Sequence, residues 1–194
     1  RHNLSNILVA STAAQALGVS LEEMKHGIES LEVVPGRLEN VASAGGYSVF
    51  VDYAHTPDAL ESVLSALRPV VKNRLLLVFG CGGDRDRSKR PLMGGIGERL
   101  SDYLWITSDN PRTEPTMGII KDIERGMSGG TYSVELDRRR AIEHAIDEAG
   151  EGDVVLVAGK GHERSQVLSD RAIHFDDREV VKEIVARNRE VSVA

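Results

Sequence analysis

From residue 47 onward, short apolar runs alternate with longer segments of helical periodicity, and this alternation constrains the possible folds more than any other feature of the chain. The run at 74–79 is almost entirely apolar, as is usual for a strand that is buried on both faces. Strands that alternate with helices in this way build a mostly parallel sheet with helices on both faces. The predicted strands are 47–52, 74–79, 103–107, 132–136 and 153–158. The predicted helices are 57–70, 91–100, 115–127, 138–149 and 177–188, with Thr56 as the N-cap of the first and Asp137 as that of the fourth.

The N-terminal segment does not follow this alternation. Two helices are predicted at 4–17 and 20–31, the second with a capping box formed by Ser20 and Glu23. No strand separates the two helices, which is a poor start for an independent domain. We therefore expect residues 1–36 to be the end of an upstream domain and 37–194 to form a domain of their own.

Two hairpins complete the expected fold. The segments 38–43 and 47–52 flank Ala-Gly-Gly, a strong turn signal, so we expect them to pair as antiparallel strands. A shorter hairpin is expected from 166–168 and 172–175 around Ser-Asp.

Composition excludes several classes of protein. The chain has 194 residues, a net charge of −6 and a pI near 5.6, which argues against nucleic-acid binding through a basic face. No apolar run approaches the roughly 18 residues of a membrane span, and no signal peptide is visible. The single cysteine, Cys81, suits a reducing cytoplasm, so we expect a cytoplasmic protein.

Four loops that follow predicted strands are rich in Gly, His, Arg and Asp. They are 52–58, 80–87, 108–113 and 159–163. Open α/β sheets place their ligand crevice at the carboxyl ends of the strands. We therefore expect all four loops to line one rim of the sheet.

The loop 108–113, Ser-Asp-Asn-Pro-Arg-Thr, carries the most informative chemistry. Arg112 offers a planar fork that suits a carboxylate, and Asp109 offers the opposite charge, which suits an ammonium group. Pro111 stiffens the loop and lowers the entropy cost of ordering a site. Asp109, Asn110 and Pro111 are also ordinary turn formers, so a plain turn is the alternative interpretation.

The other three loops allow similar alternatives. His55 could simply cap the following helix, and the glycines of 80–83 could form a turn or bring N–H groups to an anion. Arg85 is the cation nearest the end of its strand, so we expect it to point into the site. Gly159 could belong to a tight turn, but Glu163 has no evident structural task and we expect it to contact a cation or an amine.

No phosphate-binding motif is complete. The dinucleotide fingerprint lacks its third glycine after Gly80 and Gly82, and no Gly-x4-Gly-Lys-Ser/Thr sequence occurs. The chain therefore has no P-loop of its own.

Five motifs together resemble the Mur ligases of peptidoglycan synthesis, and most closely those members that add meso-2,6-diaminopimelate. The motifs are Gly-Arg-Leu-Glu at 36–39, Asp-Tyr-Ala-His-Thr-Pro-Asp at 52–58, Phe-Gly-Cys-Gly-Gly-Asp-Arg-Asp at 79–86, Asp-Asn-Pro-Arg at 109–112 and Ala-Gly-Lys-Gly-His-Glu at 158–163. They occur in the family's order and cover nearly the whole chain.

The resemblance implies a three-domain ligase, of which residues 37–194 resemble the Rossmann-like C-terminal domain and 1–36 the last helices of the central ATPase domain. It implies that the complete protein uses ATP and Mg²⁺, held mainly by that central domain. It also implies that ATP activates the D-Glu γ-carboxylate of UDP-N-acetylmuramoyl-L-alanyl-D-glutamate as an acyl phosphate, which an amine of diaminopimelate then attacks. The fragment itself is not expected to turn over, and a monomer is expected.

The resemblance also implies roles for individual residues. Arg37, Asp52 and His55 match positions that meet the nucleotide when the domains close. The positions that match those holding meso-diaminopimelate are Arg85, Asp109, Asn110, Pro111, Arg112, Gly159 and Glu163.

Two alternatives remain open at the level of sequence. One is a sister ligase that adds lysine, although lysine has no distal carboxylate and would leave Arg112 unpaired, at a cost of roughly 1–3 kcal/mol. The resemblance adds that lysine-adding relatives differ at this position. The other is a non-catalytic binding module that has kept the fold, which the missing P-loop favours.

Overall fold

The computed structural model describes residues 2–31 and 33–193, which fall into two compact units. The first unit ends at Val34 and the second begins at Pro35. Arg1, Glu32 and Ala194 belong to ranges that were predicted above and lie outside the described residues.

The first unit is a pair of helices, α1 (His2–Ala16) and α2 (Leu21–Glu29), which confirms both predicted helices. Gly18 between them has φ +86°, a conformation that glycine adopts without steric cost. The predicted capping box is present, because Ser20 Oγ accepts from the N–H of Glu23 and the Glu23 carboxylate accepts from the N–H of Ser20.

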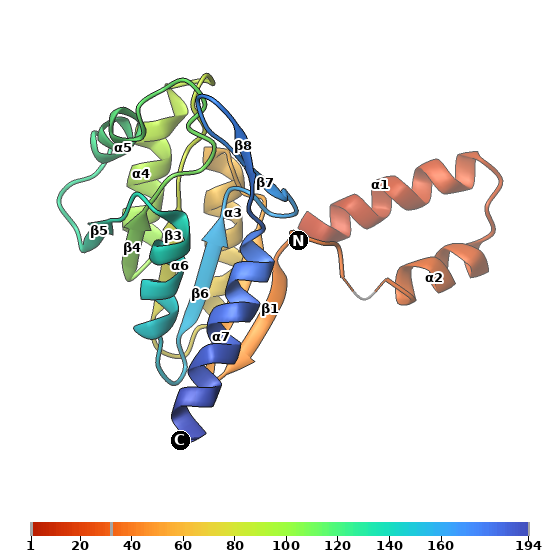
Figure 1. The fold of residues 1–194 in the computed structure, drawn as a ribbon. Helices are drawn as coiled ribbons and strands as arrows, with labels where there is room; N and C mark the ends of the chain where they lie inside the picture. The colour runs from red at the N-terminus through yellow and green to blue at the C-terminus, as the bar shows by residue number, and fades with distance from the viewer. Residues whose placement is uncertain (1, 32, 194) are drawn as a thin grey trace. The chain divides into compact units, whose positions relative to one another are not determined.

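The second unit is built on a six-stranded sheet with the order β1-β2-β6-β3-β4-β5 (Figure 1). Only β1 and β2 pair antiparallel, around the predicted Gly-Gly turn, and the other neighbours are parallel. The prediction of a mostly parallel sheet is therefore confirmed. The strands are β1 (Glu39–Ala44), β2 (Tyr47–Asp52), β3 (Leu75–Phe79), β4 (Tyr103–Ile106), β5 (Tyr132–Val134) and β6 (Val154–Ala158).

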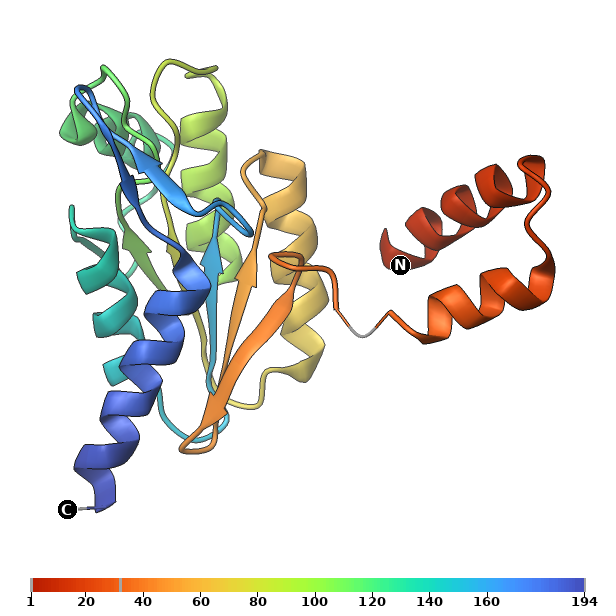
Figure 2. The ribbon, with the colours of Figure 1, turned by 45° about the vertical axis from the view of Figure 1, so that its right-hand side comes forward.

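Helices cover both faces of this sheet, as predicted. On one face lie α3 (Pro57–Leu67), α4 (Lys89–Leu100) and α5 (Thr116–Glu124), and on the other lie α6 (Arg138–Asp147) and α7 (Asp177–Val193) (Figure 2). A 3₁₀ turn, η1 (Arg68–Val70), follows α3.

The central strand β3 shows how one sequence supplies two cores. Leu75, Leu77 and Phe79 point to the α3–α4–α5 face, whereas Leu76 and Val78 point to the α6–α7 face. All five are fully buried, so a continuous apolar run is what a central strand requires. Each such side chain contributes roughly 1.5–3 kcal/mol through burial.

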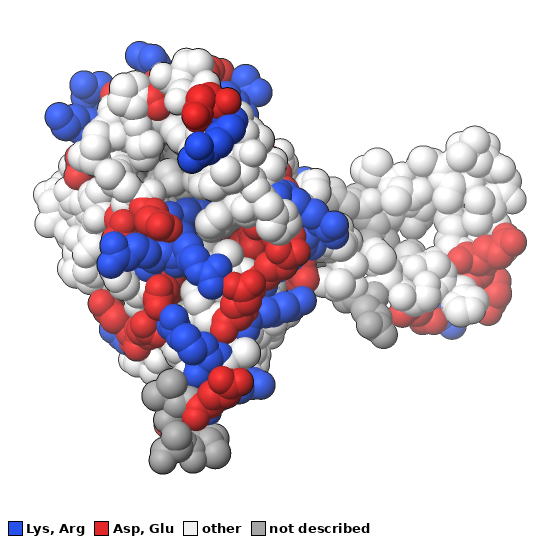
Figure 3. All heavy atoms as spheres, viewed as in Figure 1, with Lys and Arg blue, Asp and Glu red and all other residues white. Residues whose placement is uncertain are grey.

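The outer surface of α6 and α7 is covered by charges of both signs, which Figure 3 shows intermixed on that face. Arg139 of α6 pairs with Glu183 of α7 at 2.6 Å, and Arg187 of α7 pairs with Glu143 of α6 at 2.6 Å. These pairs are exposed, so each contributes little to stability, but together they leave no large single-sign field on this face.

The predicted second hairpin is also present, as β7 (Ser165–Val167) and β8 (Ala172–His174). Across the described residues, none of the helices is both long and apolar enough to cross a membrane.

Candidate functional site

The four loops singled out in the sequence leave the sheet at one edge. They follow β2, β6, β3 and β4, which are consecutive neighbours in the sheet and run parallel. Their carboxyl ends therefore share an edge, beside the β7–β8 hairpin (Figure 2). The expected common rim is confirmed.

The loops after β3 and β4 are interlocked through their backbones. The Gly83 N–H donates to the Asn110 carbonyl at 2.9 Å. A Cβ at Gly80 would lie 2.1 Å from Thr107 O, and one at Gly83 would lie 1.9 Å from Pro111 O. The close approach requires glycine at both positions. The N–H of Gly83 is thus used within the protein, which favours the turn over an anion-binding role for this N–H.

Arg112 is held at the end of the β4 loop by its backbone. Its φ of +51° is uncommon for a residue with a Cβ, and its N–H donates to the Val167 carbonyl in β7 at 3.1 Å. Its Nη1 donates to the carbonyls of Gly83, at 2.8 Å, and Asn110, at 3.4 Å. Among the described residues, no carboxylate lies within ion-pair distance of the guanidinium, so its other N–H groups remain available to a ligand.

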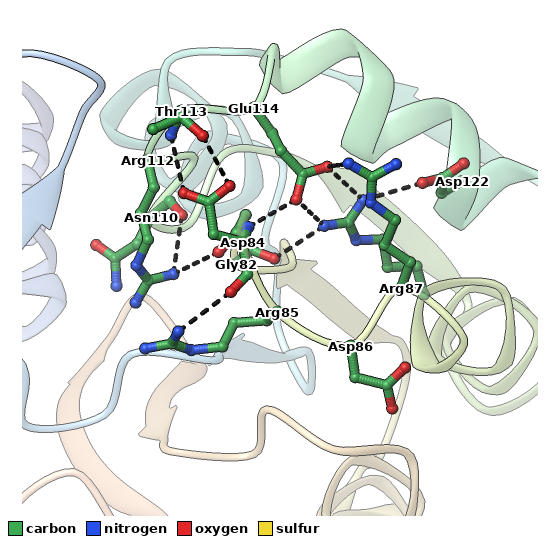
Figure 4. A network of polar contacts seen from close by, with 12 residues as sticks. Gly82, Asp84, Arg85, Asp86, Arg87, Asn110, Arg112, Thr113, Glu114 and Asp122 are labelled. Carbon is green, nitrogen blue, oxygen red and sulfur yellow. Dashed lines mark hydrogen bonds and ion pairs between the residues drawn. The ribbon is translucent and has the colours of Figure 1, made fainter.

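Arg85 lies beside Arg112. A Cβ at Gly82 would be 3.0 Å from Arg112 Nη1 and 3.8 Å from Arg85 Cγ, so the two side chains flank that glycine. Figure 4 shows both guanidinium groups on the same side of the loop. Arg85 is exposed and donates only to the carbonyl of Asp84, at 3.1 Å. The described part of the chain offers it no carboxylate partner.

A buried arginine fixes the loop that carries these two cations. Arg90 is fully buried and donates to both oxygens of Glu114, to Asp122 and to the Gly82 carbonyl. Glu114 also accepts from the N–H of Asp84 at 2.6 Å. The hydrogen bond from Arg90 lowers the pKa of Glu114 to about 2, so this carboxylate stays charged and keeps the loop in place.

A second polar group, which we call the Asn110 cluster, consists of Asp109, Asn110, Lys160, Glu163 and Gln166. Asn110 donates from Nδ2 to Glu163 Oε2 at 2.9 Å and accepts at Oδ1 from Lys160 Nζ at 3.1 Å. Gln166 Nε2 donates to the Asp109 carbonyl at 2.8 Å. The cluster therefore cross-links the loops after β4 and β6, although β3 lies between those strands.

Glu163 has one oxygen engaged and one open. Its Oε2 accepts from Asn110 and from Lys160 Nζ at 3.2 Å, so Glu163 contacts a cation as expected, and it also has a structural task that the sequence did not reveal. No partner of Oε1 is found among the described residues. Burial raises the pKa of Glu163, but the hydrogen bond from Asn110, the charge of Lys160 and that of Arg112 outweigh it, and the pKa is lowered overall. Glu163 thus presents an ionised oxygen beside Arg112.

Asp109 lies deeper than expected for a residue that would meet an ammonium group directly. Its side chain is buried, with Oδ1 accepting from the N–H of Asn110 at 2.7 Å. A Cβ at Gly159, where φ is +115°, would be 2.9 Å from its Oδ2. Burial raises the pKa of Asp109, against the opposing charges of Arg138 and Lys160.

The remaining predicted residues gather in what we call the Tyr53 cluster, which consists of Arg37, Tyr53, His55 and His162. The Arg37 guanidinium lies 4.8 Å from the Tyr53 ring centroid, and the His55 and His162 rings lie 4.6 and 5.3 Å from it. Arg37, His55 and His162 are exposed. The cluster therefore offers a cationic, aromatic surface.

Asp52 supports this surface from below. It accepts from the N–H groups of Leu38 and Ala54, both at 2.7 Å. Burial raises its pKa, although these two hydrogen bonds and the charge of Arg37 oppose the shift. The helix that follows is capped by Thr56, as predicted, and His55 instead contacts the Tyr53 carbonyl through Nδ1 at 2.9 Å.

Sequence reasoning missed two members of the Asn110 cluster, Lys160 and Gln166. Lys160 stands within the Gly-Lys-Gly motif, but no role was predicted for it. Its position just after a buried apolar strand could have indicated burial, and it is fully buried in the structure. Gln166 carried no such signal, because its contacts to Ser108 and Asp109 depend on loops that are distant in the chain.

No group of three or more His, Cys, Asp or Glu side chains that could hold a metal ion occurs among the described residues.

Comparison with known proteins shows which proteins this chain resembles. Residues 36–161 match the model of the family described as "Mur ligase, glutamate ligase domain". The UDP-N-acetylmuramoyl-L-alanyl-D-glutamate–2,6-diaminopimelate ligases of Clostridium tetani (strain Massachusetts / E88) and Gloeobacter violaceus (strain ATCC 29082 / PCC 7421) are each 52% identical, over 95% and 96% of this chain.

A solved structure of a ligase of the same name superposes with a TM-score of 0.77 at 40% identity and covers 96% of this chain. The chain spans less than two fifths of the length of the first of these relatives, 38%, and 39% of the second and of the solved chain.

Proposed function

The chain belongs to the Mur ligase family, and from that premise we propose that it is the amino-acid-binding portion of a ligase that adds meso-2,6-diaminopimelate to UDP-N-acetylmuramoyl-L-alanyl-D-glutamate. The relatives named for that reaction support this assignment through identities near 50%. One observation carries it: Arg112, which has no carboxylate partner among the described residues, lies near enough to Glu163, whose Oε1 is open, for its charge to lower the pKa of that carboxylate.

This pairing of charges fits the distal end of diaminopimelate, which carries one carboxylate and one ammonium group beyond the attacking amine. The Arg112 guanidinium has free N–H groups that suit the carboxylate, and Arg85 on the other side of Gly82 adds a second positive charge. Glu163 Oε1 suits the ammonium group. The two charges of the ligand thus meet two charges of opposite sign on the protein.

Other predicted residues support the ligand or the loop that holds it. Asn110 fixes Glu163 through its side chain, and Pro111 is buried at the contact with Gly83. Asp109 adds negative charge beneath the site, and Gly159 leaves room above it. In this proposal the negative charge of Asp109 acts on the ligand's ammonium group electrostatically, without direct contact.

The Tyr53 cluster is the second part of the proposal. An exposed cation on an aromatic ring, next to two histidines, suits a nucleotide with its phosphates and base. We propose that Arg37 and His55 contact ATP when the domains close, and that Asp52 holds the backbone beneath them. Residues 1–36 would belong to the central domain, which would bring ATP and Mg²⁺ to this edge.

The proposed reaction forms one amide bond at the expense of ATP. ATP supplies the phosphoryl group that converts the D-Glu γ-carboxylate into an acyl phosphate. The free amine of diaminopimelate, held by its distal end, attacks the acyl carbon, and inorganic phosphate leaves. This chain contributes orientation of the amine and exclusion of water, which raise the rate by placing the two reactants together.

The test is a substrate panel with the complete ligase. Supplied with ATP and UDP-N-acetylmuramoyl-L-alanyl-D-glutamate, it should consume meso-diaminopimelate with a kcat/KM far above that for L-lysine, measured as product by mass spectrometry. A preference for L-lysine would identify a sister ligase. Binding of an amino acid without ATP consumption would identify a non-catalytic module, and either result would refute the proposed reaction.

A further inference from the structure

Lys160 is a lysine whose ammonium group is entirely enclosed by the protein. It is 0% exposed and follows β6 directly. Its Nζ lies 2.7 Å from the Ser165 carbonyl, 3.1 Å from Asn110 Oδ1 and 3.2 Å from Glu163 Oε2. An ammonium group has three N–H donors and no acceptor, so these three contacts use it completely. Lys160 has nothing left with which to bind a ligand or move a proton.

The position of the ammonium group decides how Asn110 is oriented. The side-chain oxygen of Asn110 accepts from Lys160 and from the N–H of Val167, at 2.9 Å. A flipped amide would place its NH₂ group against two donors. The orientation seen here is therefore enforced, and it turns Nδ2 toward Glu163 Oε2. Lys160 thus holds Glu163 twice, once directly and once through Asn110.

Lys160 also lies between two acidic groups. Asp109, Arg112 and Arg138 are the other charged groups that act on Glu163 or on its surroundings. Arg138 is engaged by Asp177 through two bonds of 2.8 Å, and its charge is the larger one that opposes the raised pKa of Asp109, ahead of that of Lys160. For Glu163, the charge of Lys160 adds to the hydrogen bond from Asn110 in lowering the pKa.

We propose that Lys160 is a positioning residue for amino-acid selection: it fixes Glu163 through two contacts, one direct and one through Asn110, so that one carboxylate oxygen is always presented to the ligand's ammonium group. The inference rests on the proposed function, because that function supplies the ammonium group. It assigns a task to the central lysine of the Gly-Lys-Gly motif, which touches neither substrate nor nucleotide.

The decisive experiment replaces Lys160 by methionine in the complete ligase, which removes the charge and retains most of the volume. For Lys160→Met, KM for diaminopimelate should rise about tenfold or more, whereas kcat and KM for ATP should stay within about threefold. The acid limb of kcat/KM for diaminopimelate should move to higher pH by about one unit or more, because Glu163 loses its nearest positive charge. Lys182→Met, which removes an exposed lysine from α7, is the matched control and should change neither.

A second background separates positioning from a general loss of structure. In Glu163→Gln, the part of the acid limb that Glu163 contributes should be absent and only the part set by the attacking amine should remain. Adding Lys160→Met should change KM for diaminopimelate by about threefold or less, because the charge that Lys160 serves is gone. Equal losses in both backgrounds, or an acid limb that does not move in Lys160→Met, would overturn the proposal.

If Lys160→Met does not fold, the wild-type enzyme still decides the matter. Its KM for diaminopimelate should be constant from about pH 8 down to about pH 4.5, where a glutamate of ordinary pKa would be half protonated. A rise of KM within this range that Glu163→Gln abolishes would overturn the proposal. The substrate panel is run first, and the pH series uses whichever amino acid the wild type accepts. A failure of the proposed substrate is thus recognised separately from a failure of the role of Lys160.

Discussion

The Asn110 cluster and the Tyr53 cluster lie at the same edge of the sheet, yet they are built differently. In the Asn110 cluster, buried side chains from two loops satisfy one another, and a single carboxylate oxygen of Glu163 is left open. In the Tyr53 cluster the backbone is equally fixed, but Arg37 and the two histidine rings are exposed around Tyr53. The side chains of the Asn110 cluster are therefore already held by one another, whereas those of the Tyr53 cluster are still free to contact a further surface.

This difference between the two clusters has a physical explanation. A small zwitterion brings little binding energy, so its site must already be ordered before it arrives. A site that closes over a larger ligand held by another surface can leave its side chains in solvent until closure. We therefore expect single substitutions in the Asn110 region to have larger effects than those in the Tyr53 cluster.

The largest effect is expected for Arg112→Ala in the complete ligase. The ligand carboxylate would lose charge-assisted hydrogen bonds worth about 3 kcal/mol, so kcat/KM for diaminopimelate should fall on the order of 100-fold. KM for ATP should change little. Steady-state kinetics with each substrate varied in turn measures both values.

Because Arg112 has φ +51°, its replacement by alanine also keeps a strained backbone. Arg112→Gly removes the side chain and relieves that strain, so it should lose the same activity without loss of stability. Retention of wild-type kcat/KM in either variant would mean that the amino acid binds elsewhere. It would also contradict the expectation that substitutions in the Asn110 region have the larger effects.

The next effect concerns the interlocked loops. In Gly83→Ala the new Cβ would meet the backbone oxygen of Pro111 at 1.9 Å, which neither loop can avoid without moving. The free energy of unfolding of this chain should fall by about 2 kcal/mol, measured by urea denaturation. Gly82→Ala is the control, because its nearest neighbour at 3.0 Å is the mobile end of Arg112. Similar losses in both variants would contradict the idea of a preformed frame.

A smaller pair of effects, opposite in sign, is expected for two acids at this edge, the buried Asp109 and the half-buried Asp52. Burial raises the pKa of Asp109 above its ordinary value of 3.8, so the stability linked to this group is present below that pH and lost as the pH rises through the folded-state pKa. Asp109→Asn should therefore raise the free energy of unfolding by about 1 kcal/mol at pH 7 and by almost nothing near pH 4.

Asp52→Asn should do the reverse, although burial raises the pKa of Asp52 as well. Both of its oxygens accept backbone N–H groups, from Leu38 and Ala54, and an amide would present a donor to one of them. A loss of about 1–2 kcal/mol at pH 7 is expected by urea denaturation. Equal responses of Asp52→Asn and Asp109→Asn would show that burial alone governs both sites.

The smallest effect is expected for Arg37→Ala. An exposed cation stacked on an aromatic ring contributes about 0.5–1 kcal/mol, so KM for ATP should rise only about two- to fivefold. KM for diaminopimelate should be unchanged. Arg37→Lys, which keeps the charge, should lie between wild type and Arg37→Ala. A loss as large as that of Arg112→Ala would place Arg37 in a preformed site and remove the contrast.

Much of the fold could be predicted because its signals are local. The caps at Ser20, Thr56 and Asp137 depend on residues three positions away or fewer, and each is found where expected. Ends of elements were less certain: the strand predicted at 132–136 ends at Val134, and the helix predicted at 115–127 ends at Glu124.

The candidate site could be predicted only in part. The rule that parallel strands share a carboxyl edge brought the four loops together correctly. It could not show that Lys160 reaches Asn110, fifty residues away, because that contact depends on the strand order and on the close approach of Gly80 to the backbone of Thr107 and Asp109. The contacts of Glu163 and the burial of Asp109 were missed for the same reason.

The interlocked glycines also limit how such a protein can change its preference during evolution. Since Gly80 and Gly83 press against the carbonyls of Thr107 and Pro111, an insertion in either loop would separate both. A descendant that binds a different amino acid has to replace side chains while the backbone of these two loops stays the same. A change in the length of the loop after β3 or β4 would break the contacts between them, so this route to a new specificity is not available here.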